Sequence, residues 1–211
     1  MKLFTYFRSS AAYRVRIALN LKGIPHEMVP IHLVRDGGEQ HGAAYRAVNP
    51  AERVPALELD DGTVITQSLA IVDYLETTHP RPPLYPADPV ARAKALAVAL
   101  TVVADIHPVN NLRVLKYLKH DLGQKQTAID AWYVHWVREG LATIEKLVEG
   151  ERFCFGDSPT VADICLAPQV FNARRFKVAM EEFPRIAAID AHLLTLPAFA
   201  RAQPGAQADA E

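Results

Sequence analysis

Cysteine is scarce in this chain, and long apolar runs are missing. The 211 residues include two cysteines, Cys154 and Cys165, too few for a disulfide framework and too irregularly placed for a metal site. We expect both to be buried apolar side chains. No apolar run approaches the roughly 20 residues that a membrane-spanning helix requires, and the N-terminus has no charged and then apolar leader. The sequence therefore predicts a cytoplasmic protein without a metal or a membrane as a partner.

An excess of one charge sign is missing as well. The 23 basic and 24 acidic residues give a formal net charge of −1, so no overall field attracts the protein to nucleic acid or to an anionic membrane. At about 100–200 residues per domain, the length permits one large domain or two small ones. We favour two domains.

The first 19 residues run from a short apolar strand through two serines into a helix. Ser9 or Ser10 is expected to cap this helix, and the helical spacing of the apolar residues turns Arg14 and Arg16 away from the core-facing side. The free N–H groups and the dipole at a helix N-terminus attract anions, of which a thiolate is one. Because this junction has no cysteine, any thiolate must come from a bound ligand. The alternative is a capped helix without further function.

The remaining elements up to residue 78 complete one α/β domain. Residues 26–31 alternate as a second strand and give a βαβ unit, and the stretch 54–65 reads as an antiparallel hairpin around a Gly-containing turn. Pro55 opens its strand, which leaves the backbone of Val54 free to face outward. Gln67 and Ser68 begin another helix, so two helix N-termini with hydroxyls are expected to converge on a ligand that has both a thiol and a carboxylate.

The second half of the chain has the spacing of helices only. Five prolines between residues 79 and 89 predict a stiff linker. Apolar residues at helical spacing follow in four segments, residues 90–119, 126–149, 160–176 and 184–195. We therefore expect a first domain at 1–82, a linker at 83–87, an all-α domain at 88–211 and, within it, a disordered tail at 203–211.

The helical half has three notable polar features, of which two are candidates for function and the third, Asp163, is not. Pro108 is expected to kink its helix, and the polar residues around it form either one wall of a ligand cleft or an exposed face. They are Asp105, His107, Asn110, Asn111 and Arg113. Arg174 and Arg175 either complement the C-terminal helix dipole or place one guanidinium on a substrate carboxylate. Asp163 forms a capping box with Thr160, which is a role in folding.

Several motifs, in this order, resemble those of one family. They are Tyr6-Phe7-Arg8-Ser9-Ser10 with Arg14-Val15-Arg16-Ile17, Asn49-Pro50 with Val54-Pro55, Gln67-Ser68-Leu69-Ala70-Ile71, the Ser158-Pro159-Thr160-x-x-Asp163 box and Ala173-x-Arg175-Phe176-Lys177-Val178. Nearly the whole chain resembles the cytosolic glutathione transferases, and within them the zeta class of maleylacetoacetate isomerases. The resemblance implies a thioredoxin-like α/β N-terminal domain with a βαβ-ββα mixed sheet, an all-α C-terminal domain, glutathione as cofactor and a homodimer.

The resemblance also implies roles for single residues. Ser9 would support the glutathione thiolate, and Arg8 and Arg175 would hold the carboxylates of a small cis-diacid substrate. The residues that would bind glutathione or complete its cleft are Ser10, Ala11 and Ala12 at the helix start, Val54 beside a cis Pro55, Gln67 and Ser68 at the γ-glutamyl end, and Gln40, His107, Asn111 and Arg113. Thiolate addition, bond rotation and elimination would convert maleylacetoacetate to fumarylacetoacetate.

One departure from the zeta pattern and three alternative functions stay open. The family pattern Ser-Ser-Cys-x-Trp-Arg reads Ser9-Ser10-Ala11-Ala12-Tyr13-Arg14 here. The missing cysteine argues against disulfide exchange, but not against isomerisation, for which glutathione supplies the thiol. Maleylpyruvate is an alternative substrate, and zeta-class transfer to α-haloacids is an alternative reaction. The third alternative is a non-catalytic module of the same fold, which would have no need to retain Ser9, Gln67, Ser68 and Arg175 together.

Overall fold

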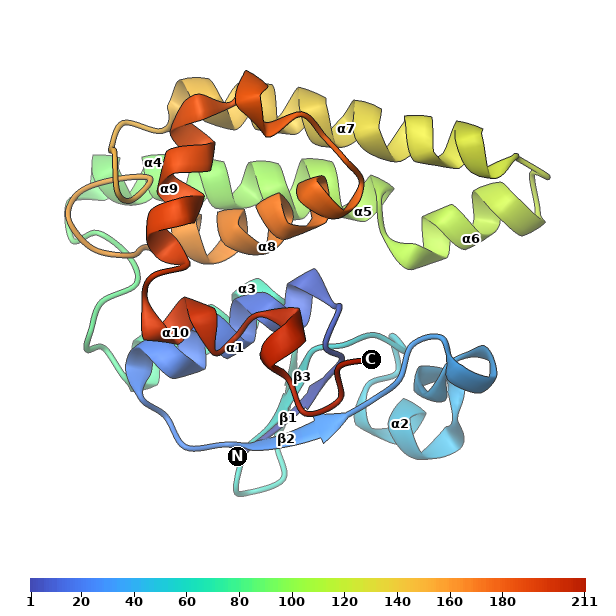
Figure 1. The fold of residues 1–211 in the computed structure, drawn as a ribbon. Coiled ribbons are helices and arrows are strands. Elements are labelled where there is room, and N and C mark those ends of the chain that lie inside the picture. Colours follow the sequence, from blue (N-terminus) through green and yellow to red (C-terminus); the bar gives the residue numbers. More distant parts are fainter. The chain divides into compact units, whose positions relative to one another are not determined.

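The computed structural model describes all residues, 1–211, and divides them into two compact units (Figure 1). The first unit consists of Met1–Leu84 and Thr195–Glu211, and the second of Tyr85–Leu194. The division after Leu84 falls inside the linker expected at 83–87. The return of Thr195–Glu211 to the first unit differs from our expectation, which assigned everything after residue 88 to the helical domain.

A mixed four-stranded sheet forms the centre of the first unit. Its strands have the order β2-β1-β3-β4, with β1 parallel to β2 and antiparallel to β3, and β3 antiparallel to β4. The helix after β1 provides the crossover that a parallel pair requires. The elements of this part are β1 (Lys2–Thr5), α1 (Ser10–Lys22), β2 (Glu27–Pro30), η1 (Arg35–Gly37), η2 (Glu39–His41), α2 (Ala43–Val48), β3 (Ala56–Glu58), β4 (Val64–Thr66) and α3 (Ser68–Thr78). The thioredoxin-like βαβ-ββα prediction is confirmed.

Helix α1 is buried along most of its length, which corrects our expectation for its arginines. Arg14 and Arg16 are only 1% and 2% exposed and are among the largest fully buried side chains of the protein. We expected both to turn away from the core. Their surroundings explain the difference, because α3 packs on α1 from within the sheet domain and α10 (Pro197–Ala200) packs on it from the end of the chain. Each guanidinium meets hydroxyl or main-chain oxygens there instead of water.

The end of the chain is an ordered part of the first unit. The Asn20 Nδ2 atom on α1 donates to the Ala198 carbonyl at 2.9 Å. Beyond α10, η5 (Pro204–Ala206) forms a short turn, and the carboxylate of Asp209 accepts the backbone N–H of Phe7 at 3.0 Å. The expected disordered tail at 203–211 is therefore replaced by a folded segment, because its carboxylates find partners in the sheet domain.

The second unit contains only helices, as predicted. They are α4 (Pro89–Leu100), the π-helical η3 (Thr101–Ile106), α5 (His107–Val109), α6 (Leu112–His120), α7 (Gln126–Leu147), α8 (Val161–Arg175), η4 (Met180–Glu182) and α9 (Pro184–Leu193). None of the protein's helices has both the length and the apolar character that a membrane crossing demands. Helix α8 is buried along most of its length. Asp163 at its start is fully buried and accepts hydrogen bonds from the Cys154 and Thr160 N–H groups at 2.7 and 2.8 Å. Its predicted capping box is present.

The helix expected over 90–119 is interrupted. Before Pro108 it widens into a π-helical turn, in which the His107 N–H bonds to the Val102 carbonyl. Proline has no N–H and its ring clashes with the carbonyl four residues earlier, so a wider turn is one way to accommodate it. The helix then ends at Val109, and a new helix starts after Asn111, whose side chain accepts the Arg113 N–H at 3.2 Å. We expected a kink at Pro108, and the structure shows that the helix ends one residue after it.

Candidate functional site

One edge of the sheet in the first unit collects most of the predicted site residues. In the strand register, Phe4 of β1 lies opposite Ala56 of β3, and Ala56 lies opposite Thr66 of β4. The end of β1, the start of β3 and the end of β4 therefore share one edge. Three predicted groups follow directly from these points: Arg8 to Ala11 after β1, Val54 before β3, and Gln67 with Ser68 after β4.

The start of α1 has the geometry of an anion site. Ser9 is the N-cap residue, and its Oγ accepts the Ala12 N–H at 3.2 Å, as predicted. The N–H of Ala11, one residue earlier, has no acceptor within the chain. Arg8 is exposed, with its guanidinium carbon 4.8 Å from the centre of the Phe7 ring. The positive end of this 13-residue helix thus has a capping hydroxyl and an open N–H, and the exposed Arg8 directly precedes the cap residue.

Arg16 holds the loop that precedes this helix start. Its guanidinium donates to the Thr5 hydroxyl at 3.1 Å and to the carbonyls of Tyr6 and Phe7 at 3.3 and 3.1 Å. It also donates to the Ala202 carbonyl at 3.0 Å. Burial lowers the pKa of Arg16 to about 10, so the side chain stays charged at neutral pH. The backbone of residues 5–7 is therefore tied to α1 and to the end of the chain.

The start of α3 forms the second helix N-terminus at this edge. Gln67 has a φ of +70°, a sparsely populated conformation that costs free energy for a residue with a side chain. Ser68 is buried, and its Oγ accepts a hydrogen bond from Arg14 at 3.2 Å. Arg14 thus connects α1 to the start of α3.

Val54 and Gln40 offer polar groups that the chain itself does not use. The Val54-Pro55 peptide bond is cis, as the resemblance implied, and neither the N–H nor the carbonyl of Val54 has a hydrogen-bond partner within the chain. Gln40 is buried. Its Nε2 donates to the Leu33 carbonyl at 3.4 Å, whereas its Oε1 has no partner within the chain. Buried polar atoms are rarely left unpaired, so both positions suit a polar ligand.

The predicted residues around Pro108 lie in the second unit. His107 Nε2 and Asn111 Nδ2 are 3.3 Å apart, and Asn111 also caps α6. Arg113 is exposed, and no carboxylate lies within 4 Å of it. Asn111 thus has a structural role as a helix cap, whereas the guanidinium of Arg113 is free to bind an anionic ligand.

The structure distinguishes the two arginines at the end of α8. Arg174 Nη2 forms an ion pair with the nearly buried Asp190 at 3.0 Å, so its charge is already compensated. Arg175 is exposed and has no carboxylate within 4 Å. Its guanidinium carbon lies 4.9 Å from the centre of the Phe176 ring, and it hydrogen-bonds to the buried Tyr133. Arg175 is therefore the cation that remains available for a ligand.

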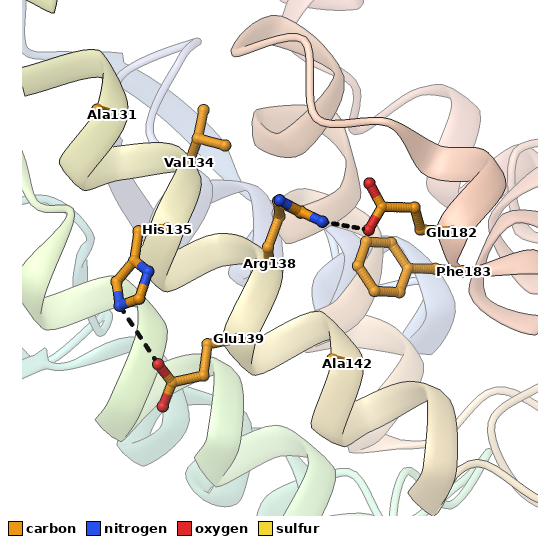
Figure 2. Close-up of a pocket in the computed structure, with 8 residues that line it drawn as sticks. All are labelled: Ala131, Val134, His135, Arg138, Glu139, Ala142, Glu182 and Phe183. Atoms are coloured by element: carbon orange, nitrogen blue, oxygen red, sulfur yellow. Dashed lines mark hydrogen bonds and ion pairs between the residues drawn. The ribbon is translucent and has the colours of Figure 1, made fainter.

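A cavity of about 520 Å³, lined by residues of α7 together with Glu182 and Phe183, contains none of the predicted residues. Its charged side chains pair with one another (Figure 2): Arg138 with Glu182 at 2.6 Å, and His135 with Glu139 at 3.5 Å. Since these groups satisfy each other, we assign no catalytic role to this cavity.

Two family models and many known proteins are similar to this chain. Residues 8–78 match the family model of the glutathione S-transferase N-terminal domain, and residues 126–191 match that of the C-terminal domain. The maleylacetoacetate isomerase of Pseudomonas aeruginosa is 46% identical over 99% of this chain and 98% of its own length. The chain belongs to the glutathione transferase family. Its similarity to the zeta class, predicted from the motifs, is confirmed at this level of identity.

Solved structures place this glutathione transferase among the zeta-class isomerases. A holo structure of maleylpyruvate isomerase, described as a bacterial glutathione S-transferase of the zeta class, matches with a TM-score of 0.96 and 44% identity over the full length of both chains. A maleylacetoacetate isomerase from Methylobacterium extorquens, with bound malonate and glutathione, matches with a TM-score of 0.95 and 40% identity over both full chains.

Three side chains that support predicted site residues of this transferase, or the loop before them, were not found from the sequence. Arg14 and Arg16 were interpreted as pointing away from the core, and Tyr133 was not singled out. The motif Arg14-Val15-Arg16 on a helix whose neighbours are all apolar was the available signal, because two arginines on such a helix need oxygen partners if they are buried. Tyr133 offered no comparable signal, since its partner Arg175 lies 42 residues further along the chain.

Proposed function

We propose that the chain converts maleylacetoacetate to fumarylacetoacetate with glutathione as cofactor. The proposal depends on one observation at the start of α1. The positive end of this helix has a capping hydroxyl and an open N–H, but no cysteine is present there. A thiol must therefore come from a ligand. The isomerase relatives, one of which binds glutathione together with the dicarboxylate malonate, support this choice of ligand and of substrate class.

The residues present fit glutathione. The open backbone of Val54 suits its peptide part, and the N-terminus of α3 at Gln67 and Ser68 suits its γ-glutamyl carboxylate. Ser10 and Ala11 extend the helix end that faces the thiol, and the unpaired Oε1 of Gln40 can accept one of its N–H groups. When bound, glutathione supplies a thiolate that adds reversibly to the cis double bond.

The side chains of this protein supply charge and position. Ser9 donates a hydrogen bond to the thiolate, and the α1 dipole favours its negative charge. Arg8 and Arg175 hold the substrate carboxylates, and their cations stabilise the negative charge that develops on the substrate in the transition state. We assign His107, Asn111 and Arg113 of the second unit to the binding of glutathione as well.

Ser9→Ala tests the role of the hydroxyl. We expect the apparent pKa of bound glutathione to rise by about 1–2, which lowers kcat/KM near neutral pH by roughly 10- to 100-fold. The measurement is the ultraviolet absorbance of the thiolate as a function of pH. The variant also loses a helix cap, at a cost of about 1 kcal/mol. Asp88→Ala is the matched control, because Asp88 caps α4 in the same way, at 2.8 Å from the Ala91 N–H. An equal loss of activity in both variants would refute the role of Ser9.

A direct comparison of two substrates tests the reaction. We expect the purified chain, with glutathione, to isomerise maleylacetoacetate with a higher kcat/KM than maleylpyruvate, as followed by ultraviolet absorbance. The structural match to a maleylpyruvate isomerase makes maleylpyruvate the second candidate substrate. A higher kcat/KM with maleylpyruvate would make it the preferred substrate and maleylacetoacetate the second. Turnover of α-haloacids without either isomerisation would indicate a general zeta-class transferase instead.

We also propose that the protein acts as a homodimer in the cytoplasm. Both cysteines are free thiols in buried positions, which is typical of proteins from reducing compartments. Sedimentation of the purified chain measures the oligomeric state.

A further inference from the structure

The segment 203–211, here called the C-terminal strap, has contacts that the proposed function does not use. It lies in the first unit, although the chain reaches it only after passing through the whole second unit. The strap and the loops beside it enclose a cavity of about 370 Å³, lined by Pro30, His32, Arg35, Glu39 and strap residues 208–211. The side chains of the strap contact two loops, the one before Ser9 and the one before Gln40.

The first contact is at the loop that leads into α1. The Asp209 Oδ2 atom accepts the N–H of Phe7 at 3.0 Å, two residues before Ser9. Phe7 is buried, so its N–H would lack a partner without this carboxylate. The carbonyl of the same residue accepts from Arg16 at 3.1 Å, and Arg16 in turn donates to the Ala202 carbonyl, next to the strap. The Phe7 N–H is thus held directly by the end of the chain, and the Phe7 carbonyl is held by Arg16, which is itself bonded to the end of the chain.

The second contact is at the loop that leads to Gln40. The Glu211 Oε1 atom accepts from Arg35 Nη2 at 2.6 Å and lies 3.4 Å from His32 Nε2. The side chains of Arg35 and Glu211 are each about half exposed. Exposed ion pairs contribute little to stability on their own. Asp209 therefore has the larger effect, and Glu211 adds to it.

We propose that the strap positions the thiol-binding part of the site, with Asp209 as the positioning residue. The hydrogen bond from Phe7 to Asp209 fixes the turn between β1 and α1. In that turn Ser9 has the backbone conformation of a cap, and its own N–H bonds to the Tyr6 carbonyl at 2.9 Å. A free turn would sample other conformations, in which the Ser9 hydroxyl no longer faces the thiol. This inference rests on the proposed function in that the ligand is glutathione.

Three variants test the proposal. Asp209→Ala removes the acceptor, Asp209→Asn keeps an oxygen that can accept the Phe7 N–H, and Asp73→Ala is the matched control. Asp73 is an exposed residue of α3 whose carboxylate has no hydrogen bond or ion pair. Glutathione binding is measured by calorimetry, the thiol pKa by ultraviolet titration, and the exchange of the Phe7 to Ser9 amides by mass spectrometry on the ligand-free protein.

We expect Asp209→Ala to weaken glutathione binding by about 3- to 10-fold, the effect of one hydrogen bond. The pKa of the bound thiol should rise, and the amides of residues 7–9 should exchange faster. Asp209→Asn should restore most of the affinity, and Asp73→Ala should match the wild type. Equal affinity, thiol pKa and exchange in Asp209→Ala and the wild type would overturn the strap proposal alone. A wild-type chain that does not bind glutathione would overturn the proposed function instead.

Discussion

Arg175→Gln is expected to lower kcat/KM for the cis-diacid by about 100- to 1000-fold, the loss that follows removal of one preorganised donor to a developing negative charge. The affinity for glutathione should change by less than about twofold, because Arg175 is assigned to the substrate and not to the cofactor. The guanidinium is exposed and free of carboxylates, and Tyr133 and Phe176 support it. Burial raises the pKa of Tyr133 to about 12, so this support stays a neutral hydroxyl over the whole working range of pH. Steady-state kinetics and calorimetry measure the two effects separately.

The neighbouring arginine provides the control. Arg174→Gln should leave kcat/KM within about twofold of the wild type but lower the free energy of unfolding by about 1–3 kcal/mol, since it leaves the carboxylate of Asp190 unpaired. That carboxylate is only 4% exposed, and its burial raises the pKa of Asp190. If Arg174→Gln lost as much activity as Arg175→Gln, or if Arg175→Gln lost glutathione affinity in proportion to activity, the assignment of Arg175 would be wrong.

Arg16→Met is expected to destabilise the first unit by about 3–5 kcal/mol, which is at the upper end of single substitutions. Methionine fills part of the volume but donates nothing, so the Thr5 hydroxyl and the carbonyls of Tyr6, Phe7 and Ala202 lose a buried donor. Urea unfolding of the purified chain, followed by circular dichroism, measures the loss.

Arg138→Met is the matched control for Arg16→Met. Arg138 is 53% exposed, and its partner Glu182 is 40% exposed, so the same substitution should cost less than about 1 kcal/mol. A loss below about 1 kcal/mol in Arg16→Met would contradict the role of Arg16 as the residue that ties the site loop to the end of the chain.

The sheet domain was predictable because its signals are local. Ser9 caps α1 as its position before an apolar helical pattern predicted, and the turn around Gly62 separates two antiparallel strands. Once the order of strands and helices was established, the positions of Val54, Gln67 and Ser68 followed from topology, since the ends of β1 and β4 and the start of β3 must share an edge. The capping box of Asp163 was equally local.

The features that were missed depend on contacts between distant parts of the chain. Arg16 is buried because Ala202, 186 residues later, offers it a carbonyl, and no pattern within α1 indicates this. The same holds for the C-terminal strap, whose small polar residues have the composition of a disordered tail but whose Asp209 finds the Phe7 N–H 202 residues away. The resemblance already pointed to Arg175, but the reason that Arg174 is not available, its ion pair with Asp190, depends on the packing of α9 on α8.

Replacing glutathione by S-methylglutathione in the isomerase assay tests most directly whether a ligand thiolate beside Ser9 performs the reaction. S-methylglutathione keeps the groups assigned to Val54, Gln67 and Ser68 but has no ionisable thiol. We expect rapid conversion of maleylacetoacetate with glutathione, and no conversion above the uncatalysed rate with S-methylglutathione, although calorimetry shows that it binds. Conversion at equal rates with both compounds, or without either, would contradict the proposed mechanism.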